Sequence, residues 1–161
     1  MAEIEQPQPV FCDSFEHKLD GAWRVVLPKD WRGLKVTEFF LIESSASSSI
    51  CAFPRAEFEK HIASVENDPT RTDRRQRNDF LEDFGSACKR VVLDKDGRIT
   101  LPQSLCEKIG IGPKNPQLEL RGAVRFFRIW NKEKLTMRQE GQAMIAAAGE
   151  RPVRAQDILG I

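Results

Sequence analysis

The sequence has few of the residues from which metal centres and most active sites are built. Its histidines are His17 and His61, and none of its cysteines lies in a C-x-x-C pair. The four cysteines are Cys12, Cys51, Cys88 and Cys106. A structural zinc site needs clustered thiolate and imidazole ligands, so we expect no metal and no cofactor. In a reducing compartment we expect these thiols to be buried as small apolar side chains.

Long apolar runs and a strong net charge are also missing. No stretch approaches the roughly 20 apolar residues that cross a bilayer. The opening segment MAEIEQPQPV lacks the basic start and apolar centre of a secretion signal. We therefore expect a cytoplasmic protein with no membrane partner. The net charge is only +1 over 161 residues, so nucleic-acid binding would need a local basic face.

A catalytic constellation is missing from the sequence as well. Neither histidine has a serine or cysteine partner at an informative spacing, and there is no glycine-rich loop of the kind that holds phosphates. We therefore expect no enzymatic activity and no small-molecule substrate.

What the sequence does contain is one pattern that occurs twice. LDGAWRVVLP (19–28) and LDKDGRITLP (93–102) share Leu, Asp, Arg, Leu and Pro at the same five of ten positions. Each copy is followed by the same plan of proline, short helix, strand pair, aromatic residue and helix. Such a repeat predicts two halves that pair about a pseudo-twofold axis. Either half alone would expose too much apolar strand surface, which the other half covers.

The residue patterns predict an α+β fold. Strands are expected at β-branched and aromatic runs, and helices where proline or aspartate precedes an apolar stripe. The expected strands are 36–43, 50–53, 91–93, 99–101 and a pair around Gly122. A tight Asp96-Gly97 turn is expected to join 91–93 and 99–101 as a hairpin. The expected helices follow Pro54, run from Asp68-Pro69 to Cys88, and span 103–110, ended by Gly110, and 132–150.

The chain is divided accordingly into five parts. Residues 1–10 are expected to be a flexible lead-in and 11–66 the first repeat. Residues 67–88 form the connecting helix, 89–139 the second repeat, and 140–161 a C-terminal helix or tail.

Each copy of the pattern carries an Asp and an Arg in D-x-x-x-R spacing, Asp20 with Arg24 and Asp94 with Arg98. In a turn, an Asp side chain accepts hydrogen bonds from nearby backbone N–H groups, and Gly97 permits a positive φ. One interpretation is that these pairs only brace hairpins. The other is that the pseudo-twofold brings both arginines to a common surface, where guanidinium forks suit phosphate and guanine.

Other basic residues flank the two motifs. We take Arg24, Arg98, Lys95 and Lys18 as candidate DNA-binding residues, and Asp20, Asp94 and Gly97 as turn-structuring residues. Also close in sequence are Lys29, Arg32, Lys89 and Arg90. A second cluster, RTDRRQR (71–77), has four arginines and one aspartate. It is interpreted as a solvated helix face, with contact to phosphate or to a neighbouring subunit as the alternatives.

The two motifs resemble those of the MraZ family, relatives of the AbrB/MazE swapped-hairpin DNA binders. The resemblance rests on Phe11, on Leu19-Asp20 with Arg24, and on Leu93-Asp94-x-x-Gly97-Arg98. It extends through RRQRNDFLEDFGSACKRVVLDKDGR and LRGAVRFFRIWNKEKL, so that it covers roughly residues 11–139.

This resemblance implies a fold, an assembly and a function. The fold would be two SpoVT-AbrB-like repeats with swapped hairpins, resembling a double-split β-barrel. The assembly would be a ring-shaped homo-oligomer. The function would be nucleoid-associated regulation of transcription, through double-stranded DNA with repeated short G-rich boxes upstream of the division and cell-wall gene cluster. Arg24 and Arg98 would face that DNA.

The first motif departs from the family pattern. Trp23 occupies the position before the Arg where the family usually has Gly, and Asp13 stands where Gly is common. We therefore expect the first turn to differ in shape from the second, and Arg24 to matter less than Arg98. Trp23 would stack on a sugar or pack against a neighbouring subunit.

One rival interpretation comes from the same superfamily. In it, the chain is an antitoxin-like interaction module whose C-terminal helix binds a protein partner. Antitoxins usually place an extended acidic tail after a single hairpin motif. The duplicated motif and short tail seen here favour the regulator.

Overall fold

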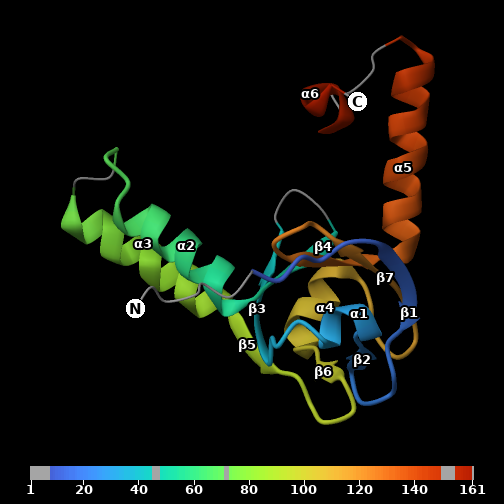
Figure 1. Cartoon of the computed structure of the whole chain (residues 1–161), viewed down its shortest axis with the longest axis horizontal. Helices are drawn as coiled ribbons and strands as arrows, with labels where there is room; N and C mark the ends of the chain where they lie inside the picture. The colour runs from blue at the N-terminus through green and yellow to red at the C-terminus, as the bar shows by residue number, and fades with distance from the viewer. Residues whose placement is uncertain (1–7, 45–47, 71–72, 150–154, 161) are drawn as a thin grey trace, which may run out of the picture.

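Figure 1 shows the computed structural model of the chain, which describes residues 8–44, 48–70, 73–149 and 155–160. The elements in chain order are β1 (Ser14–Lys18), β2 (Arg24–Val26), α1 (Lys29–Arg32), β3 (Glu38–Glu43), β4 (Ser49–Phe53), α2 (Arg55–Glu66), α3 (Arg74–Ala87), β5 (Lys89–Val92), β6 (Arg98–Thr100), α4 (Gln103–Ile109), β7 (Gln117–Gly122), β8 (Phe127–Asn131), α5 (Lys132–Ala147) and α6 (Ala155–Leu159). The lead-in predicted at 1–10 lies mostly outside the described residues.

Most expected elements are present with boundaries shifted by one to three residues, and the start of one helix differs more. Gly110 ends α4 in the left-handed conformation, with φ of 77°, as predicted. Helix α3, however, begins at Arg74, and its cap is Asp73, whose side chain accepts from the N–H of Arg75. Asp68, the predicted cap, instead accepts two hydrogen bonds from Thr70 in the preceding turn. Both aspartates suit a cap, so the sequence pattern alone did not choose between them.

The fold is α+β, with antiparallel pairing in both of its sheets. One sheet has six strands in the order β1-β7-β8-β4-β3-β5, and β2 pairs with β6 in a separate ribbon. The strands in the described ranges form no closed barrel, so the barrel-like expectation is wrong in that respect. The predicted hairpin is also wrong: β5 and β6 flank the Asp96-Gly97 turn but belong to different sheets.

The two halves of the chain exchange strand partners. Strand β1 pairs with β7, β5 with β3, and β2 with β6, so each of these pairs joins the first half to the second. The registers are symmetric as well. Val25 pairs with its counterpart Ile99 at the centre of the β2–β6 ribbon, and Cys51 pairs with its counterpart Arg128 at the centre of β4–β8. An approximate twofold axis therefore passes through both centres.

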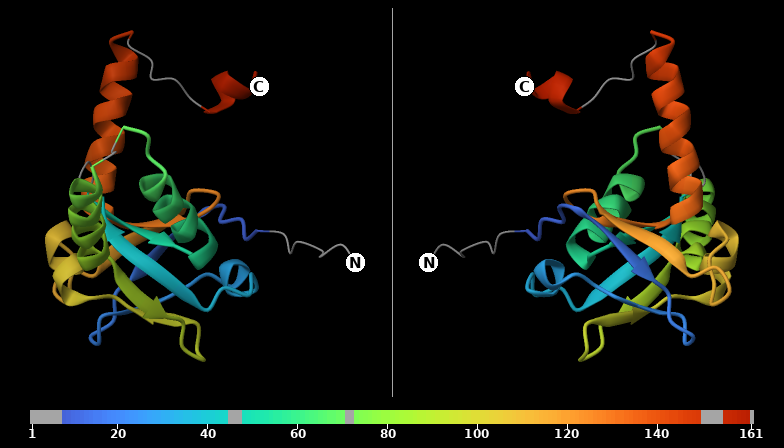
Figure 2. Two further views of the ribbon diagram at one scale, coloured as in Figure 1. Left: turned by 90° about the vertical axis from the view of Figure 1, so that its left-hand side faces the viewer. Right: turned by 90° about the vertical axis from the view of Figure 1, so that its right-hand side faces the viewer.

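The main core lies between the six-stranded sheet and a second layer made of the β2–β6 ribbon, α1 and α4. Side chains alternate along the strands, as in any half-buried sheet. Phe39 and Leu41 of β3 point into this core, whereas Phe40 and Ile42 point to the opposite face. Helices α2 and α5 contact that opposite face, where α5 projects away from the sheet (Figure 2).

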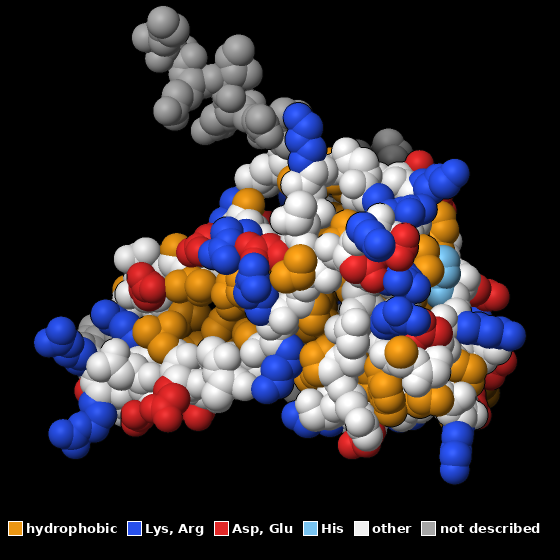
Figure 3. All heavy atoms as spheres, turned by 90° about the horizontal axis from the view of Figure 1, so that it is seen from below, with side chains coloured by type: hydrophobic (Ala, Val, Ile, Leu, Met, Phe, Trp, Pro, Cys, Tyr) orange, Lys and Arg blue, Asp and Glu red, His pale blue; other side chains and the backbone are white. Residues whose placement is uncertain are grey.

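Helices α2 and α3 form a pair that extends from one edge of the molecule. Its stability rests on a stack of phenylalanine rings. Phe58 stacks on Phe40 at 4.2 Å between centroids and on Phe84 at 5.6 Å, and Phe84 lies 6.5 Å from Phe80. Figure 3 shows apolar side chains open to solvent along this pair. None of the helices in the described ranges is long and apolar enough to cross a membrane.

The cysteines occupy different environments. Cys51 and Cys106 are buried, and desolvation raises the pKa of the Cys106 thiol to about 12. Cys88 is half-buried. Cys12 is exposed, so the expectation of burial is wrong for that residue, which lies in the irregular stretch before β1.

The ribbon at the twofold axis generates a test of the fold. Ile99 has no exposed surface, whereas Val26 on the same ribbon is 41 % exposed. We predict that Ile99→Ala lowers the free energy of unfolding by about 2–5 kcal/mol, because it leaves a cavity in the core. Val26→Ala should change it by no more than about 0.5 kcal/mol. Urea titration of both variants measures the difference, and equal effects would contradict this packing.

Candidate nucleic-acid interface

The first D-x-x-x-R motif forms a turn between β1 and β2. The Oδ1 atom of Asp20 accepts from the backbone N–H of Ala22 at 2.9 Å and of Arg24 at 2.8 Å. Its Oδ2 atom accepts from the Nε of Arg24 at 2.8 Å. The backbone closes the same turn, with the N–H of Trp23 donating to the carbonyl of Asp20 at 3.1 Å. One aspartate therefore holds both the loop and its arginine.

The second motif repeats this arrangement between β5 and β6. The Oδ1 atom of Asp94 accepts from the N–H groups of Asp96 and Arg98, each at 2.9 Å. Its Oδ2 atom accepts from the Nε of Arg98 at 3.0 Å. The N–H of Gly97 donates to the carbonyl of Asp94 at 3.1 Å. One contact is added here: the Nη2 of Arg98 also donates to Asp96, at 2.9 Å.

Trp23 adopts the backbone conformation that the family pattern reserves for glycine. Its φ is 63°, close to the 77° of Gly97 at the matching position. The expectation of a differently shaped first turn is therefore wrong. A tryptophan in this region carries backbone strain of about 1–2 kcal/mol. Its ring is half-buried against the core, and a Cβ at Gly112 would lie 3.4 Å from it, so Trp23 packs within its own chain.

The β2–β6 ribbon places the two arginines on one face. Val25 and Ile99 point into the core, so Arg24 and Arg98, one residue earlier on each strand, point outward. The ribbon also joins the turns directly. The N–H of Leu27 donates to Gly97 at 2.9 Å and that of Leu101 donates to Trp23 at 2.7 Å. Both turns lie at the end of the molecule opposite α5 (Figures 1 and 2).

Both aspartates are held in the ionised form. The backbone N–H of Arg24 lowers the pKa of Asp20, and that of Arg98 lowers the pKa of Asp94, with the guanidinium groups adding to the effect. Because the folded pKa lies below the unfolded value, this stabilisation is present at neutral pH. It is lost only as the pH falls through the folded pKa. At neutral pH each guanidinium is therefore fixed by a charged partner.

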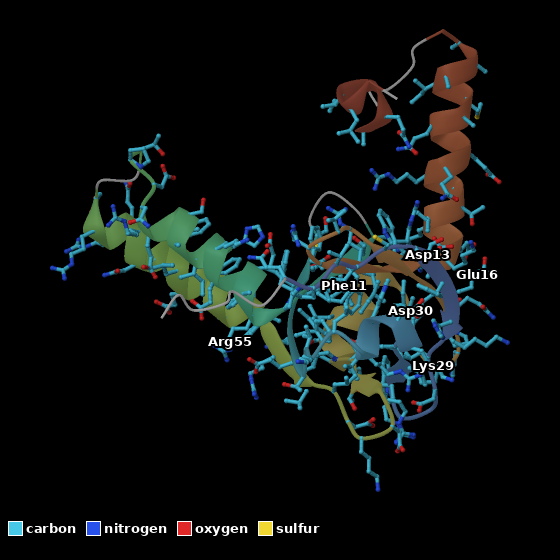
Figure 4. The ribbon with its side chains drawn as sticks, in the orientation of Figure 1. Phe11, Asp13, Glu16, Lys29, Asp30 and Arg55 are labelled. Atoms are coloured by element: carbon cyan, nitrogen blue, oxygen red, sulfur yellow. The ribbon has the colours of Figure 1, made fainter. Side chains whose placement is uncertain are left out.

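The other predicted residues are distributed less uniformly. Lys18 and Lys95 are exposed beside the first and second turns, respectively. Lys29 is exposed on α1 (Figure 4), and Lys89 is exposed on β5. Arg90 lies on the six-stranded sheet, where it forms an ion pair with Glu38.

Arg32 belongs to this site although it is remote from the second turn in sequence. A Cβ added to Gly97 would collide with the Arg32 side chain, so α1 of the first half covers the turn of the second half. The Nε of Arg32 is buried and has no hydrogen-bond partner among the described residues. The sequence singled out Arg32 only because it lies close to the first motif. That position did not indicate a contact with the second turn.

The face that carries the turns is of mixed charge. Figure 3 shows Lys and Arg side chains interspersed with Asp and Glu on this side of the molecule. Of the second basic cluster, Arg74 and Arg75 are exposed on α3, and Arg71 lies outside the described residues. The arrangement offers fixed guanidinium groups at defined positions rather than a broad cationic surface, and so suits recognition of particular acceptor atoms.

Comparison with curated proteins matches the chain to a class of bacterial transcriptional regulators over nearly its whole length. The protein named transcriptional regulator MraZ from Caulobacter vibrioides is 30% identical over 156 residues, which cover 91% of this chain and 93% of that protein. Its namesake in Phenylobacterium zucineum is 30% identical, with 91% of each chain covered. The namesake in Clostridium acetobutylicum is 26% identical over 142 residues, covering 88% of this chain and 96% of the relative.

No protein-family model matches the chain. The curated relatives establish the family, because 30% identity extends over 91% of this chain. The chain belongs to the MraZ family of transcriptional regulators.

The contact between Arg32 and the second turn generates a stability test. We predict that Gly97→Ala lowers the free energy of unfolding by about 1–2 kcal/mol, because alanine is strained at positive φ and its Cβ displaces Arg32. Gly21→Ala in the first turn is the control, since a Cβ there meets nothing within 4 Å. It should be neutral or stabilise by up to about 1 kcal/mol. Thermal unfolding of both variants distinguishes these outcomes, and a neutral Gly97→Ala would contradict the packing.

Proposed function

We propose that this protein regulates transcription by binding double-stranded DNA at repeated short G-rich boxes, upstream of the division and cell-wall gene cluster. It would act on the nucleoid, and the two D-x-x-x-R turns would contact the DNA. The observation that carries the proposal is the equivalence of the turns. Each presents an arginine, fixed by its own aspartate, on the same face of the β2–β6 ribbon.

The chemistry of the fixed arginines supports base recognition. An aspartate on Nε orients the guanidinium and leaves its Nη groups to donate to an acceptor pair. The O6 and N7 atoms of guanine form such a pair in the major groove, where a two-stranded ribbon fits. Lys18, Lys95 and Arg32, on the flanks of the turns, would contact phosphates and set the register.

The proposal includes swapped-hairpin halves. Its support is that β1, β2 and β5 each pair with a strand of the other half, in symmetric registers. In that arrangement the turns of a single chain act as a pair.

The second turn carries an internal competitor for DNA. Asp96 binds the Nη2 of Arg98, whereas the matching residue of the first turn is Ala22, and Asp20 is the one described carboxylate bonded to Arg24. Asp96 also places a negative charge beside the proposed path of the phosphates. Since the turns share one geometry, the reason for ranking Arg98 above Arg24 no longer holds, and we expect comparable contributions.

We predict that Arg24→Ala and Arg98→Ala each weaken binding to a duplex with two G-rich boxes by about 1–3 kcal/mol, roughly 10- to 100-fold. Asp96→Ala should strengthen binding, because it frees Arg98 and removes a charge. Arg125→Ala is the control, because it removes an exposed arginine from the β7–β8 connection, which adjoins the start of β1 rather than the turn at its end. Fluorescence anisotropy at fixed salt measures all four variants.

The box sequence for these probes comes from sequencing the DNA that co-purifies with the protein. Circular dichroism establishes that each variant is folded. Folded Arg24→Ala and Arg98→Ala proteins with unchanged affinity, beside a weakened Arg125→Ala, would rule out the turns as the DNA contact.

We also propose that the protein forms ring-shaped homo-oligomers. Support comes from helix α5, which exposes Met137, Met144 and Ile145 to the extent of 64, 74 and 50 %. Met137 and Met144 lie two turns apart on one side of the helix. A free chain would leave these apolar side chains in water, whereas a neighbouring copy would cover them.

Light scattering at micromolar concentration should give a mass several times the 18.3 kDa of one chain. Replacing both Met137 and Met144 by lysine should shift the protein toward smaller species, because it places charge in an apolar contact. Ala146→Lys adds a charge on the opposite side of the helix and serves as the control. A wild-type mass near 18 kDa would contradict the proposed assembly.

A further inference from the structure

A cationic cavity lies on the face of the six-stranded sheet that carries α5. Its volume is about 300 Å³, and residues of β7, β8 and α5 line it. Three arginines contribute to the lining, Arg121, Arg128 and Arg138, together with Trp130 and the amides of two glutamines. None of the described residues that line it is acidic. The DNA-contacting turns proposed above lie at the other end of the molecule, so this cavity is separate from them (Figure 1).

Two of these arginines face each other across neighbouring strands. Arg121 of β7 and Arg128 of β8 are direct partners in the antiparallel register. Like charges at directly opposed positions destabilise a sheet. The nearby carboxylate is Glu119, whose Oε2 lies 3.6 Å from the Nε of Arg121. Glu119 also binds Lys132 at 3.1 Å, and Lys132 binds Glu16 at 2.9 Å, so Glu119 serves as counter-charge for Arg121 but leaves Arg128 without a carboxylate partner among the described residues.

Aromatic rings position the guanidinium groups. Arg138 of α5 lies over Trp130, with 5.0 Å from its Cζ to the ring centroid. Arg128 lies over Phe126 at 5.8 Å. A guanidinium that lies over an aromatic face can still donate its N–H groups away from the ring, where a third group can accept them. Aromatic rings therefore hold Arg128 and Arg138, and Glu119 holds Arg121, around the same space.

The pseudo-twofold provides an internal comparison. In the first half the equivalents of Arg121 and Arg128 are Ile42 and Cys51, which are also direct partners, on β3 and β4. The equivalent of the Trp130–Arg138 contact is Phe53 with His61, at 4.8 Å between ring centroids. That position is apolar, and Phe84 of α3 packs on it.

The same place in the fold therefore has two chemistries. In the first half it is an apolar cluster, covered by a helix of the chain itself. In the second half three arginines take the places of Ile42, Cys51 and His61, and no described helix takes the place of α3 over them. Opposed arginines do not help the second half to fold, because the first half keeps an uncharged isoleucine–cysteine pair at the same place.

We propose that this cavity binds a small anion that carries two or more phosphate groups, such as pyrophosphate or the phosphate chain of a nucleotide. Arg forks bind phosphate oxygens in a bidentate manner, and an anion between Arg121 and Arg128 turns their repulsion into attraction. The site takes a free ligand rather than the DNA backbone, because a duplex lying across the turns at the opposite end cannot reach it.

Isothermal titration with pyrophosphate, at ionic strength matched with sodium chloride, tests the proposal on the full-length protein. Saturable binding of about one anion per chain is expected. Arg128→Gln and Arg138→Gln should each weaken it by at least about tenfold, because each loses a charge-assisted contact. Arg125→Gln removes an exposed arginine on the β7–β8 connection, outside the cavity lining, and should retain the wild-type affinity.

Thermal unfolding gives a second measurement, and its first part needs no ligand. In chloride alone, Arg121→Gln should raise the midpoint by roughly one to three degrees, because it relieves the opposed charges. The same substitution should abolish the further rise that pyrophosphate gives the wild-type protein. A variant that is stabilised without ligand and insensitive to it is the signature of a site built for an anion.

Three results would overturn the proposal. One is pyrophosphate binding no tighter than the chloride background. Another is equal loss of affinity in Arg125→Gln and Arg128→Gln. The third is displacement of pyrophosphate by a duplex without G-rich boxes, which would assign the cavity to DNA phosphates. Because no step uses the turns, failure of the DNA proposal leaves this test unaffected.

Discussion

The β2–β6 ribbon is the interaction on which the rest of the molecule depends. It pairs three residues of one half with three of the other, and its centre, Val25 with Ile99, lies in the core. Because each turn leads directly into one of its strands, the ribbon fixes the separation of the turns and the direction of Arg24 and Arg98. Strand exchange at β1 and β5 then ties the same halves together across the larger sheet. A half-chain would lose its partners in all three places.

This construction gives a symmetric backbone with two faces that differ in how far their side chains keep the symmetry. On the turn face, symmetry is kept even where the residues differ, since Trp23 accepts the strained conformation of a glycine. On the helix face, symmetry of the backbone is combined with opposite chemistry, apolar around Cys51 and cationic around Arg128. We interpret the first face as the common function of the two repeats, and the second as the place where the repeats have separate roles.

Features that depend on local chemistry were predictable from the sequence. The duplicated motif, the Gly110 cap and the Asp–Arg pairing within each turn follow from residues a few positions apart. Features set by distant partners were not. The local hairpin was wrong because β6 finds its partner in the other half, and the strain at Trp23 is held by tertiary packing. Arg32 over Gly97 and the arginine cavity join residues whose proximity exists only in the folded chain.

The central claim is that two turns of one chain, joined by the ribbon, act as a single DNA-binding unit. Amide hydrogen exchange with and without a duplex of repeated G-rich boxes tests it most directly. The account predicts slower exchange on DNA binding in both 20–24 and 94–98, and no DNA-dependent change at the cavity-lining segment of α5. Protection of one turn alone, or protection at the arginine cavity with both turns unchanged, would contradict it.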